Sequence, residues 1–596
     1  MENTAPAAAP TDFTKLLDDQ VQSMLSRANM GLSPIALGLA AADWAMHLAA
    51  SPGKQMALAQ KAAALSREAL QRSLTAHTPE APEKDTRFKD AAWAQWPYSA
   101  LKEGFKASDA WWREATQVDG MSRHHRHMVD FFARQGLDAM SPSNWAATNP
   151  VVLAKARETG GESLRKGLQH FLEDLQAQAK AKADTPSEAL EPLEFAVGKD
   201  VACTPGKVVF RNHLIEVIQY LPTTAKVQPE PVLIVPSCIM KYYILDLSPG
   251  NSMVKYLVEQ GHTVCIVSWR NPDASDRDLK MQDYLSSGVL TAMQATKAST
   301  GASRIHTVGY CLGGTFLAIA AATLGRLARK KPSEWTAKEK ALVPADLPEL
   351  ASVILLAAQT DFSEPGELGV FIDDEQLEGL RRSMAEKGYL SGKQMGGSFQ
   401  FLASKDLVWS RNTSRYLLGE EDSSFDLMSW NADQTRLPAR MHSEYLSSLF
   451  LNNALANGQY RFAGATVALM DISAPMMVVG TTRDHVSPWK SVYKIHLQTD
   501  THVTFVLAAG GHNAGIVSEP GRPRRSYQIA SVEDGQGWID PDDWVAQAPV
   551  VQGSWWEAMH AWLTERSGAA IKPPAIAPET VVCDAPGDYV MVRYAD

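Results

Sequence analysis

The chain has 596 residues, of which 45% are hydrophobic and 21% are charged, and its net charge is −10. This length predicts two domains, and the composition excludes wholesale disorder and a membrane bundle. The net negative charge does not indicate the basic surface that nucleic-acid binding requires. The first residues, MENTAPAAAPTDF, lack the features of a secretory signal, so we expect a cytoplasmic protein without a transmembrane segment.

Cysteine is scarce in this long chain. There is an odd number, five, and no CxxC pair occurs: Cys203, Cys238, Cys265, Cys311 and Cys583. This usage argues against a disulfide scaffold and against a zinc site. We therefore expect no metal site. We also expect reduced thiols, one of which can take part in catalysis.

Helical patterns dominate the first part of the chain. Residues 1–10 form an Ala/Pro tail, for which we expect disorder, and an amphipathic helix is predicted from residue 11. That helix either docks on the rest of the fold or meets a partner or an apolar particle. Helical periodicity continues to about residue 183, interrupted by a structured loop at 141–150. The basic run RHHRH at 123–127 lacks carboxylates or cysteines at ligand spacing and is interpreted as a solvated helix face.

The pattern changes near residue 190, where we place the boundary between a mainly helical domain, 1–190, and a second domain, 191–596. Short β-rich runs alternate there with helix-length segments, which predicts an α/β fold with a mostly parallel sheet and crossover helices. A lid insertion over the sheet is expected at about 360–470. The eight predicted strands are 208–212, 214–220, 232–236, 263–269, 304–310, 352–358, 476–480 and 502–508.

The sequence GYCLGG, residues 309–314, follows one of these strands and precedes a small-residue helix. A cysteine between glycines is often only a small core residue, but a strand, G-x-nucleophile-x-G and a helix form a nucleophile elbow. Gly309 and Gly313 leave room for the sharp turn, and the helix N-terminus favours a thiolate at Cys311. We predict that Cys311 is the nucleophile of an α/β-hydrolase fold.

Partners for this nucleophile occur downstream in the order that the fold requires, which is acid and then histidine. Asp484 and His512 each follow a predicted strand, although a helix cap and a polar loop residue are the plain alternatives. His485 is interpreted as a neighbour of the site or a substitute acid–base group, and Tyr310 as a further neighbour. The backbone N–H groups of Leu312 and Ile239 are the candidates for the oxyanion hole. Cys238 is expected to be a packed small residue.

Together these motifs resemble the polyhydroxyalkanoate synthase family, specifically its single-subunit class I members. The similar stretches run from about residue 87 to the end of the chain. They include RFKDAAWAQWP, SPSNWAATNP, KYYILDLSPGNSMVKYLVEQGHTVCIVSWRNPD, GYCLGG, TDFSEPGELGVFID, DLVWS, FDLMSWN, GTTRDHVSPW, GGHNAGIVSEP and GSWWEAM.

The resemblance implies polymerisation of (R)-3-hydroxyacyl groups, 3-hydroxybutyryl above all, from coenzyme A thioesters, with coenzyme A released and no other cofactor. It also implies a cytoplasmic, granule-bound dimer in contact with the growing polyester and with granule-associated proteins. Cys311, His512 and Asp484 would be its nucleophile, base and carboxylate.

The chain departs from the family pattern in the loop assigned to the oxyanion hole. The family usually has PPxINKYY where this chain has PSCIMKYY, so Ser237 and Met240 differ. A thioesterase or polyester depolymerase on the same fold, and a granule-surface paralogue without catalysis, remain the alternatives. The sequence leaves open the acyl chain length, the dimer interface, and whether Asp484 acts directly on the 3-hydroxyl.

Overall fold

The chain forms two compact units in the computed structural model. One contains Met1–Asp184, Gly369–Glu386 and Gly397–Asp422, and the other contains Thr185–Leu368, Lys387–Gly396 and Ser423–Asp596. The residues that the structure describes are 33–75, 83, 85–183, 193–402, 405–421, 425–532 and 537–594. The tail at 1–10, the amphipathic helix expected from residue 11 and the boundary expected near 190 lie outside them. The domain assignment therefore stays a prediction.

The first unit is helical where the structure describes it. Its helices are α2 (Pro34–Ala49), α3 (Pro52–Thr75), α4 (Tyr98–Ala115), α5 (Arg123–Ala139), α6 (Pro150–Glu158) and α7 (Glu162–Ala183). The predicted loop at 141–150 is ordered by its own polar side chains, since Asn149 donates to the Ser143 carbonyl oxygen at 2.7 Å and caps α6.

Two stretches of the expected lid group with these helices rather than with the sheet. Phe371 packs against Phe131, with ring centroids 5.9 Å apart, and Arg415 makes two 3.0 Å bonds with Asp174. His124 of the RHHRH run lies 3.3 Å from the Asp373 carboxylate. The sequence pattern did not indicate this grouping, because the contacts join residues more than two hundred positions apart.

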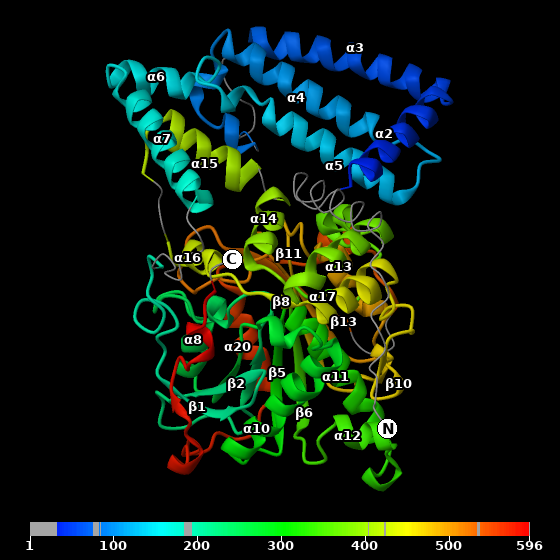
Figure 1. The fold of residues 1–596 in the computed structure, drawn as a ribbon, viewed down its shortest axis with the longest axis vertical. Coiled ribbons are helices and arrows are strands. Elements are labelled where there is room, and N and C mark those ends of the chain that lie inside the picture. The colour runs from blue at the N-terminus through cyan, green and yellow to red at the C-terminus, as the bar shows by residue number, and fades with distance from the viewer. Residues whose placement is uncertain are drawn as a thin grey trace, which may run out of the picture. The chain divides into compact units, whose positions relative to one another are not determined.

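The second unit is built on one mixed sheet, shown in Figure 1. Among the described residues the sheet has eleven strands in the order β14-β13-β12-β11-β6-β5-β3-β4-β2-β1-β15. The run from β4 to β12 in this order is parallel, and the strands outside it pair antiparallel. The six central strands, which make the five parallel pairs, confirm the predicted α/β class, whereas the five pairs toward the two edges are antiparallel and make the sheet mixed.

All eight predicted strands are present. They are β1 (Gly206–Arg211), β2 (Ile215–Tyr220), β3 (Val232–Val235), β4 (Val264–Trp269), β5 (Arg304–Tyr310), β6 (Glu349–Leu356), β11 (Met476–Thr481) and β12 (Val503–Ala508). The sequence did not indicate β13 (Ser526–Val532), β14 (Val550–Gln552) or β15 (Cys583–Asp584). The edge strands β14 and β15 are short, and β13, which lies next to β14, is half-exposed, so all three lack the continuous apolar runs that mark a buried strand.

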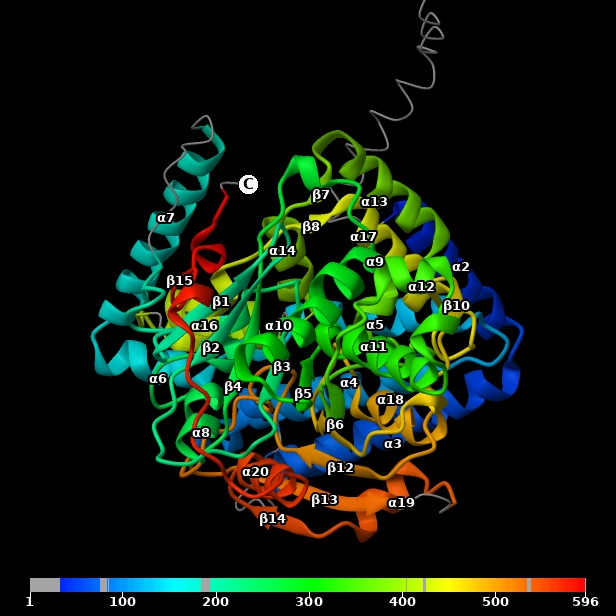
Figure 2. The ribbon, with the colours of Figure 1, turned by 90° about the horizontal axis from the view of Figure 1, so that it is seen from below.

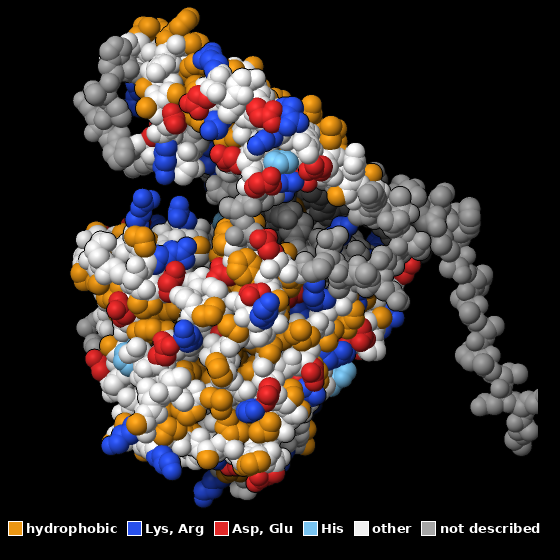
Figure 3. All heavy atoms as spheres, turned by 90° about the vertical axis from the view of Figure 1, so that its left-hand side faces the viewer, with side chains coloured by type: hydrophobic (Ala, Val, Ile, Leu, Met, Phe, Trp, Pro, Cys, Tyr) orange, Lys and Arg blue, Asp and Glu red, His pale blue; other side chains and the backbone are white. Residues whose placement is uncertain are grey.

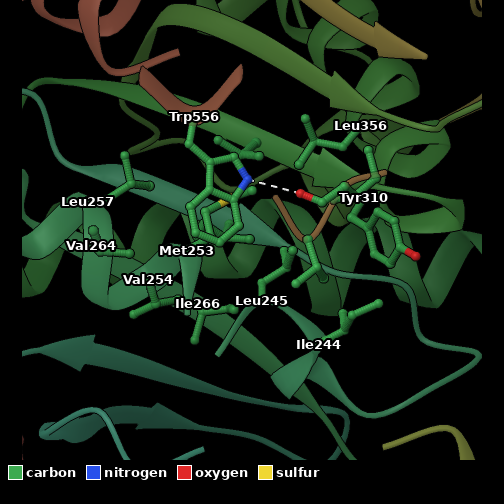
Figure 4. Packing of buried hydrophobic residues seen from close by; sticks show 14 of the residues in the cluster. Ile244, Leu245, Met253, Val254, Leu257, Val264, Ile266, Tyr310, Leu356 and Trp556 are labelled. Atoms are coloured by element: carbon green, nitrogen blue, oxygen red, sulfur yellow. Dashed lines mark hydrogen bonds between the residues drawn. The ribbon is translucent and has the colours of Figure 1, made fainter. Parts of the chain in front are cut away.

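Helices cover both faces of the sheet, as Figure 2 shows for α8 (Met253–Glu259) and α20 (Trp555–Glu565) against α10 (Thr291–Thr300) and α11 (Leu312–Ala328). On the α8 and α20 side, Met253, Val254 and Trp556 pack on Ile266 and its neighbours (Figure 4). The Trp556 indole N–H in this core donates to the Ile516 carbonyl oxygen at 2.9 Å. The buried indole of Trp556 is thus both packed against apolar side chains and hydrogen-bonded.

The segment between β6 and β11 holds short elements. They are α13 (Asp374–Lys387), β7 (Tyr389–Leu390), α14 (Gly392–Leu402), α15 (Ser410–Asn412), α16 (Asp426–Ala432), β8 (Leu437–Pro438), α17 (Ala439–Tyr445), β9 (Arg461–Phe462) and β10 (Ala465–Thr466). The remaining helices of the second unit are α9 (Met281–Asp283), α12 (Ala337–Leu342), α18 (Trp489–Tyr493) and α19 (Pro541–Gln547).

No helix among the described residues is long and apolar enough to cross a membrane. On the face drawn in Figure 3, acidic and basic side chains both occur among hydrophobic and other side chains, and small groups of basic side chains are visible.

Buried histidines should make the second unit sensitive to acid. Burial lowers the pKa of His262 to about 3 and that of His306 to about 4, and both side chains are fully buried. The unfolded chain binds these protons near pH 6.5 and the folded chain does not, so stability is complete above pH 6.5 and falls below it. We expect the free energy of unfolding to drop by about 2 kcal/mol per histidine between pH 6.5 and 5.

Urea unfolding at several pH values, followed by the tryptophan fluorescence to which the buried Trp555 and Trp556 contribute, measures this slope. Replacing His262 with Phe should remove the share of the slope that belongs to one histidine. An unfolding free energy that stays level from pH 7.5 to 5 would contradict the prediction.

Candidate active site

Cys311 occupies the tight turn between β5 and α11. Its backbone has φ 53° and ψ −128°, which is a strained conformation for a residue with a side chain. The turn is held by the Cys311 N–H, which donates to the Leu356 carbonyl oxygen of the neighbouring strand at 2.9 Å. The thiol is partly exposed and stands at the N-terminus of a 17-residue helix, where partial positive charge favours an anion.

The glycines around Cys311 are required by close backbone approaches. A Cβ at Gly309 would lie 2.4 Å from the Gly314 Cα, and one at Gly313 would lie 2.3 Å from the Pro236 carbonyl oxygen. A Cβ at Gly314 would lie 2.5 Å from the Ala358 Cβ. Glycine at these three positions therefore lets strand, turn and helix pack together, as a nucleophile elbow needs.

His512 lies between Cys311 and Asp484. Its Nδ1 is 2.8 Å from Asp484 Oδ2, and its side chain also hydrogen-bonds that of Cys311. Burial lowers the pKa of His512, but Asp484 and Cys311 raise it more, so that it lies well above the ordinary value. A raised pKa favours an imidazolium facing the sulfur, which stabilises a thiolate there.

Asp484 is held in place by its own loop. The N–H groups of Val486 and Ser487 donate to Oδ1 at 2.9 and 2.7 Å, and the Thr481 hydroxyl donates to Oδ2 at 3.2 Å. The Asp484 side chain is fully buried, and beyond the bonds from its own loop its carboxylate contacts His512. This arrangement sets the tautomer and the orientation of the imidazole.

The two candidate oxyanion donors differ in the hydrogen bonding of their backbone N–H groups. Leu312 is the first residue of α11, where a backbone N–H has no partner within the helix. The Ile239 N–H instead donates to the Ser237 hydroxyl at 3.3 Å, a long bond. Ser237, one of the departures from the family pattern, thus competes for the second predicted donor.

The two predicted neighbours of the site have distinct positions. Tyr310 packs against the His512 ring at 5.7 Å between centroids and donates its hydroxyl to Asn513 Oδ1 at 2.6 Å. His485 is partly exposed, and its carbonyl oxygen accepts from the Glu367 N–H at 2.9 Å. The structure thus shows Tyr310 against the imidazole and His485 holding a loop through its backbone.

Comparison with known proteins gives matches along most of the chain. Residues 84–257 match the family model described as the N-terminus of poly-beta-hydroxybutyrate polymerase (PhaC), and residues 12–54 match a second model described as poly-beta-hydroxybutyrate polymerase N terminal. The poly(3-hydroxyalkanoate) polymerase of Methylorubrum extorquens is 37% identical over 551 residues, which is 90% of this chain and 86% of the relative.

A poly(3-hydroxyalkanoate) polymerase subunit of Cupriavidus necator is 35% identical over 523 residues, covering 86% of this chain and 84% of the relative. The chain belongs to the poly(3-hydroxyalkanoate) polymerase family. It is therefore an enzyme of the acyltransferase type. Among solved structures, a carboxyl esterase from Bacillus coagulans is similar with a TM-score of 0.33 and 13% identity, over 59% of this chain and 94% of that one.

Sequence reasoning missed two residues in the surroundings of the candidate site. Burial raises the pKa of Tyr445 well above its ordinary value, and the charges of Cys311 and Cys238 add to this, so its phenol lies near both thiols. Asn513 was missed as the acceptor for Tyr310. Asn513 adjoins His512 in the sequence and was open to inference, whereas Tyr445 is 134 positions from Cys311 and carries no local signal.

One group of possible metal ligands occurs among the described residues. Glu216, Cys583 and Asp588 place ligand atoms within 4.8 Å of one another. Arg211 donates to both carboxylates at 2.5 Å, and its guanidinium supplies the positive charge there. Ion pairing therefore accounts for the cluster.

Proposed function

We propose that this chain polymerises (R)-3-hydroxyacyl groups, 3-hydroxybutyryl foremost, from their coenzyme A thioesters through an acyl-enzyme on Cys311. The observation that supports the proposal is the hydrogen-bonded series Cys311, His512 and Asp484 on a nucleophile elbow, in a member of the polymerase family. Coenzyme A is part of the substrate and a product, and the proposal needs no other cofactor.

The first half-reaction transfers the acyl group. The Cys311 thiolate attacks the thioester carbonyl, and the Leu312 N–H donates to the developing oxyanion. The intermediate collapses with loss of coenzyme A as a thiolate, which takes a proton from the imidazolium of His512. A thioester to Cys311 has then replaced the thioester to coenzyme A, and His512 is neutral.

The second half-reaction forms the ester. Neutral His512 accepts the proton of a 3-hydroxyl group as that oxygen attacks the acyl-Cys311 carbonyl, and the Cys311 thiolate leaves. Cysteine suits this step because exchange of one thioester for another changes the free energy little, so the acyl-enzyme stays activated. A serine ester would lie much closer in energy to the polyester and would lose the driving force for chain growth.

The place where the reaction occurs is part of the same proposal. A long polyester is insoluble in water and separates into granules, so we propose that the enzyme works as a homodimer at the surface of such granules in the cytoplasm. Granule-associated proteins would be its neighbours there.

The product decides between this proposal and its alternatives. Incubation with 3-hydroxybutyryl-CoA should release coenzyme A and turn the solution turbid with high-mass polyester, because the 3-hydroxyl outcompetes water. Coenzyme A release by thiol titration and product size by chromatography, measured together, test this. Release with equal amounts of monomeric 3-hydroxy acid would indicate a thioesterase, and no release would indicate a non-catalytic granule protein.

A further inference from the structure

Lys241 is a buried lysine close to the predicted oxyanion hole. Its residue is 3% exposed, and it follows Ile239 by two positions. An ammonium removed from water is costly unless each of its protons has a partner. The partners of Lys241 therefore indicate what the side chain holds together.

Among the residues that the structure describes, the hydrogen-bond partners of the Lys241 ammonium all belong to one distant segment. Its Nζ donates to the carbonyl oxygens of Val592 at 2.6 Å, Val590 at 2.9 Å and Tyr589 at 3.4 Å. Burial lowers the pKa of Lys241 to about 8, while Asp433 raises it and Arg593 lowers it further. Three protons thus meet three carbonyl oxygens, more than three hundred positions away in the sequence.

The segment 589–594 is itself fixed to the ends of the sheet strands. The Tyr589 hydroxyl donates to the Asn212 carbonyl oxygen at 2.5 Å, between β1 and β2. The Tyr594 hydroxyl donates to the Asn271 carbonyl oxygen at 3.2 Å, just after β4. Val590 is buried. Lys241 is therefore tied to a segment that is anchored on the rigid part of the unit.

The other side of the same loop is held by residues 430–435, which lie within the insertion between β6 and β11. The Trp430 indole N–H donates to the Lys241 carbonyl oxygen at 2.8 Å, and the Thr435 hydroxyl donates to that of Ile239. Met240 forms an antiparallel bridge with Gln434. Loop 238–241 is thus held on two sides. Residues 430–435 hold one side, and segment 589–594 holds the other through the ammonium of Lys241.

We propose that Lys241 is a positioning residue for the oxyanion hole, and that segment 589–594 acts through it. Its three bonds fix the main chain of Ile239 beside the Cys311 turn, against which the Pro236 carbonyl already packs closely. A donor helps the transition state only when it is held in place before the reaction. This inference rests on the proposed function, because it needs an acyl transfer to measure.

The first test compares Lys241→Met with wild type and with Lys255→Met. Methionine keeps the apolar length and removes the donors. We expect kcat to fall about 10- to 100-fold, since loss of one oxyanion donor costs about 10²- to 10³-fold, with KM changed less than about 2-fold. Lys255 also donates to a carbonyl oxygen, that of Pro249 at 3.1 Å, but it is partly exposed on α8, so Lys255→Met should keep the wild-type kcat.

The second test asks whether Lys241 and segment 589–594 act together. Tyr589→Phe removes the anchor to Asn212 and should lower kcat about 3- to 10-fold in the wild type but not further in Lys241→Met. Lys241→Gln, which keeps two N–H donors, should recover part of kcat and serves if Lys241→Met does not fold. A folded Lys241→Met or Lys241→Gln with wild-type kcat, or multiplicative effects of the Lys241 and Tyr589 changes, would overturn the inference. Absence of coenzyme A release from the wild type would instead overturn the proposed function.

Discussion

Replacing Cys311 with Ala should lower coenzyme A release from 3-hydroxybutyryl-CoA by about 10⁴-fold or more. The variant loses the only atom that forms the acyl-enzyme in the proposed mechanism. It keeps a Cβ at the strained φ of 53°, so the elbow should be no less stable than with cysteine. Stopped-flow measurement of free thiol, with thermal unfolding to check the fold, measures both effects.

A matched control is available for the Cys311 variant. Cys203 is likewise a partly exposed thiol of the second unit, and Cys203→Ala should retain full coenzyme A release. Cys238→Ala should also release coenzyme A, since Cys238 is buried and burial, with the charge of Cys311 next, raises its pKa far above the ordinary value. Substantial release by Cys311→Ala would show that another group carries the acyl chain.

Replacing Asp484 with Asn should separate the two half-reactions. The helix N-terminus still favours the thiolate of Cys311, so we expect loading of the acyl group to slow less than about 10-fold. Elongation should slow about 10²- to 10⁴-fold, because an alcohol is a far weaker acid than a thiol. It needs a strong base in the correct tautomer, and Asp484 both raises the pKa of His512 and bonds its Nδ1.

His512→Ala is the comparison for Asp484→Asn, and it should impair loading and elongation alike, since it removes the group that exchanges protons in both steps. Mass spectrometry of the protein after brief mixing with substrate detects the acyl adduct directly. The division of roles would be wrong if Asp484→Asn never acquired acyl mass. It would also be wrong if that variant polymerised at the wild-type rate.

Much of the second unit was predictable from local patterns. Apolar runs of strand length marked all eight predicted strands. The signal is clearest in the six parallel strands of the sheet centre, which are buried along most of their length, because a buried parallel strand needs apolar side chains throughout. The elbow was predictable since Gly309 and Gly313 stand where any side chain would collide with backbone. Asp484 and His512 were found because each follows a strand, and the parallel strands β11 and β12 end at the same edge of the sheet.

The sequence by itself therefore determined the α/β class, the strands of the sheet centre and the candidates for the triad, since these follow from side-chain period, size and order along the chain. Only the tertiary structure decided which distant groups meet. It brought Tyr445 to the thiols, the carbonyl oxygens of 589–592 to Lys241, and residues 369–386 to the helices of the first unit. Such contacts depend on how a whole fold closes loops of a hundred residues and more, and neither periodicity nor spacing in the sequence records that.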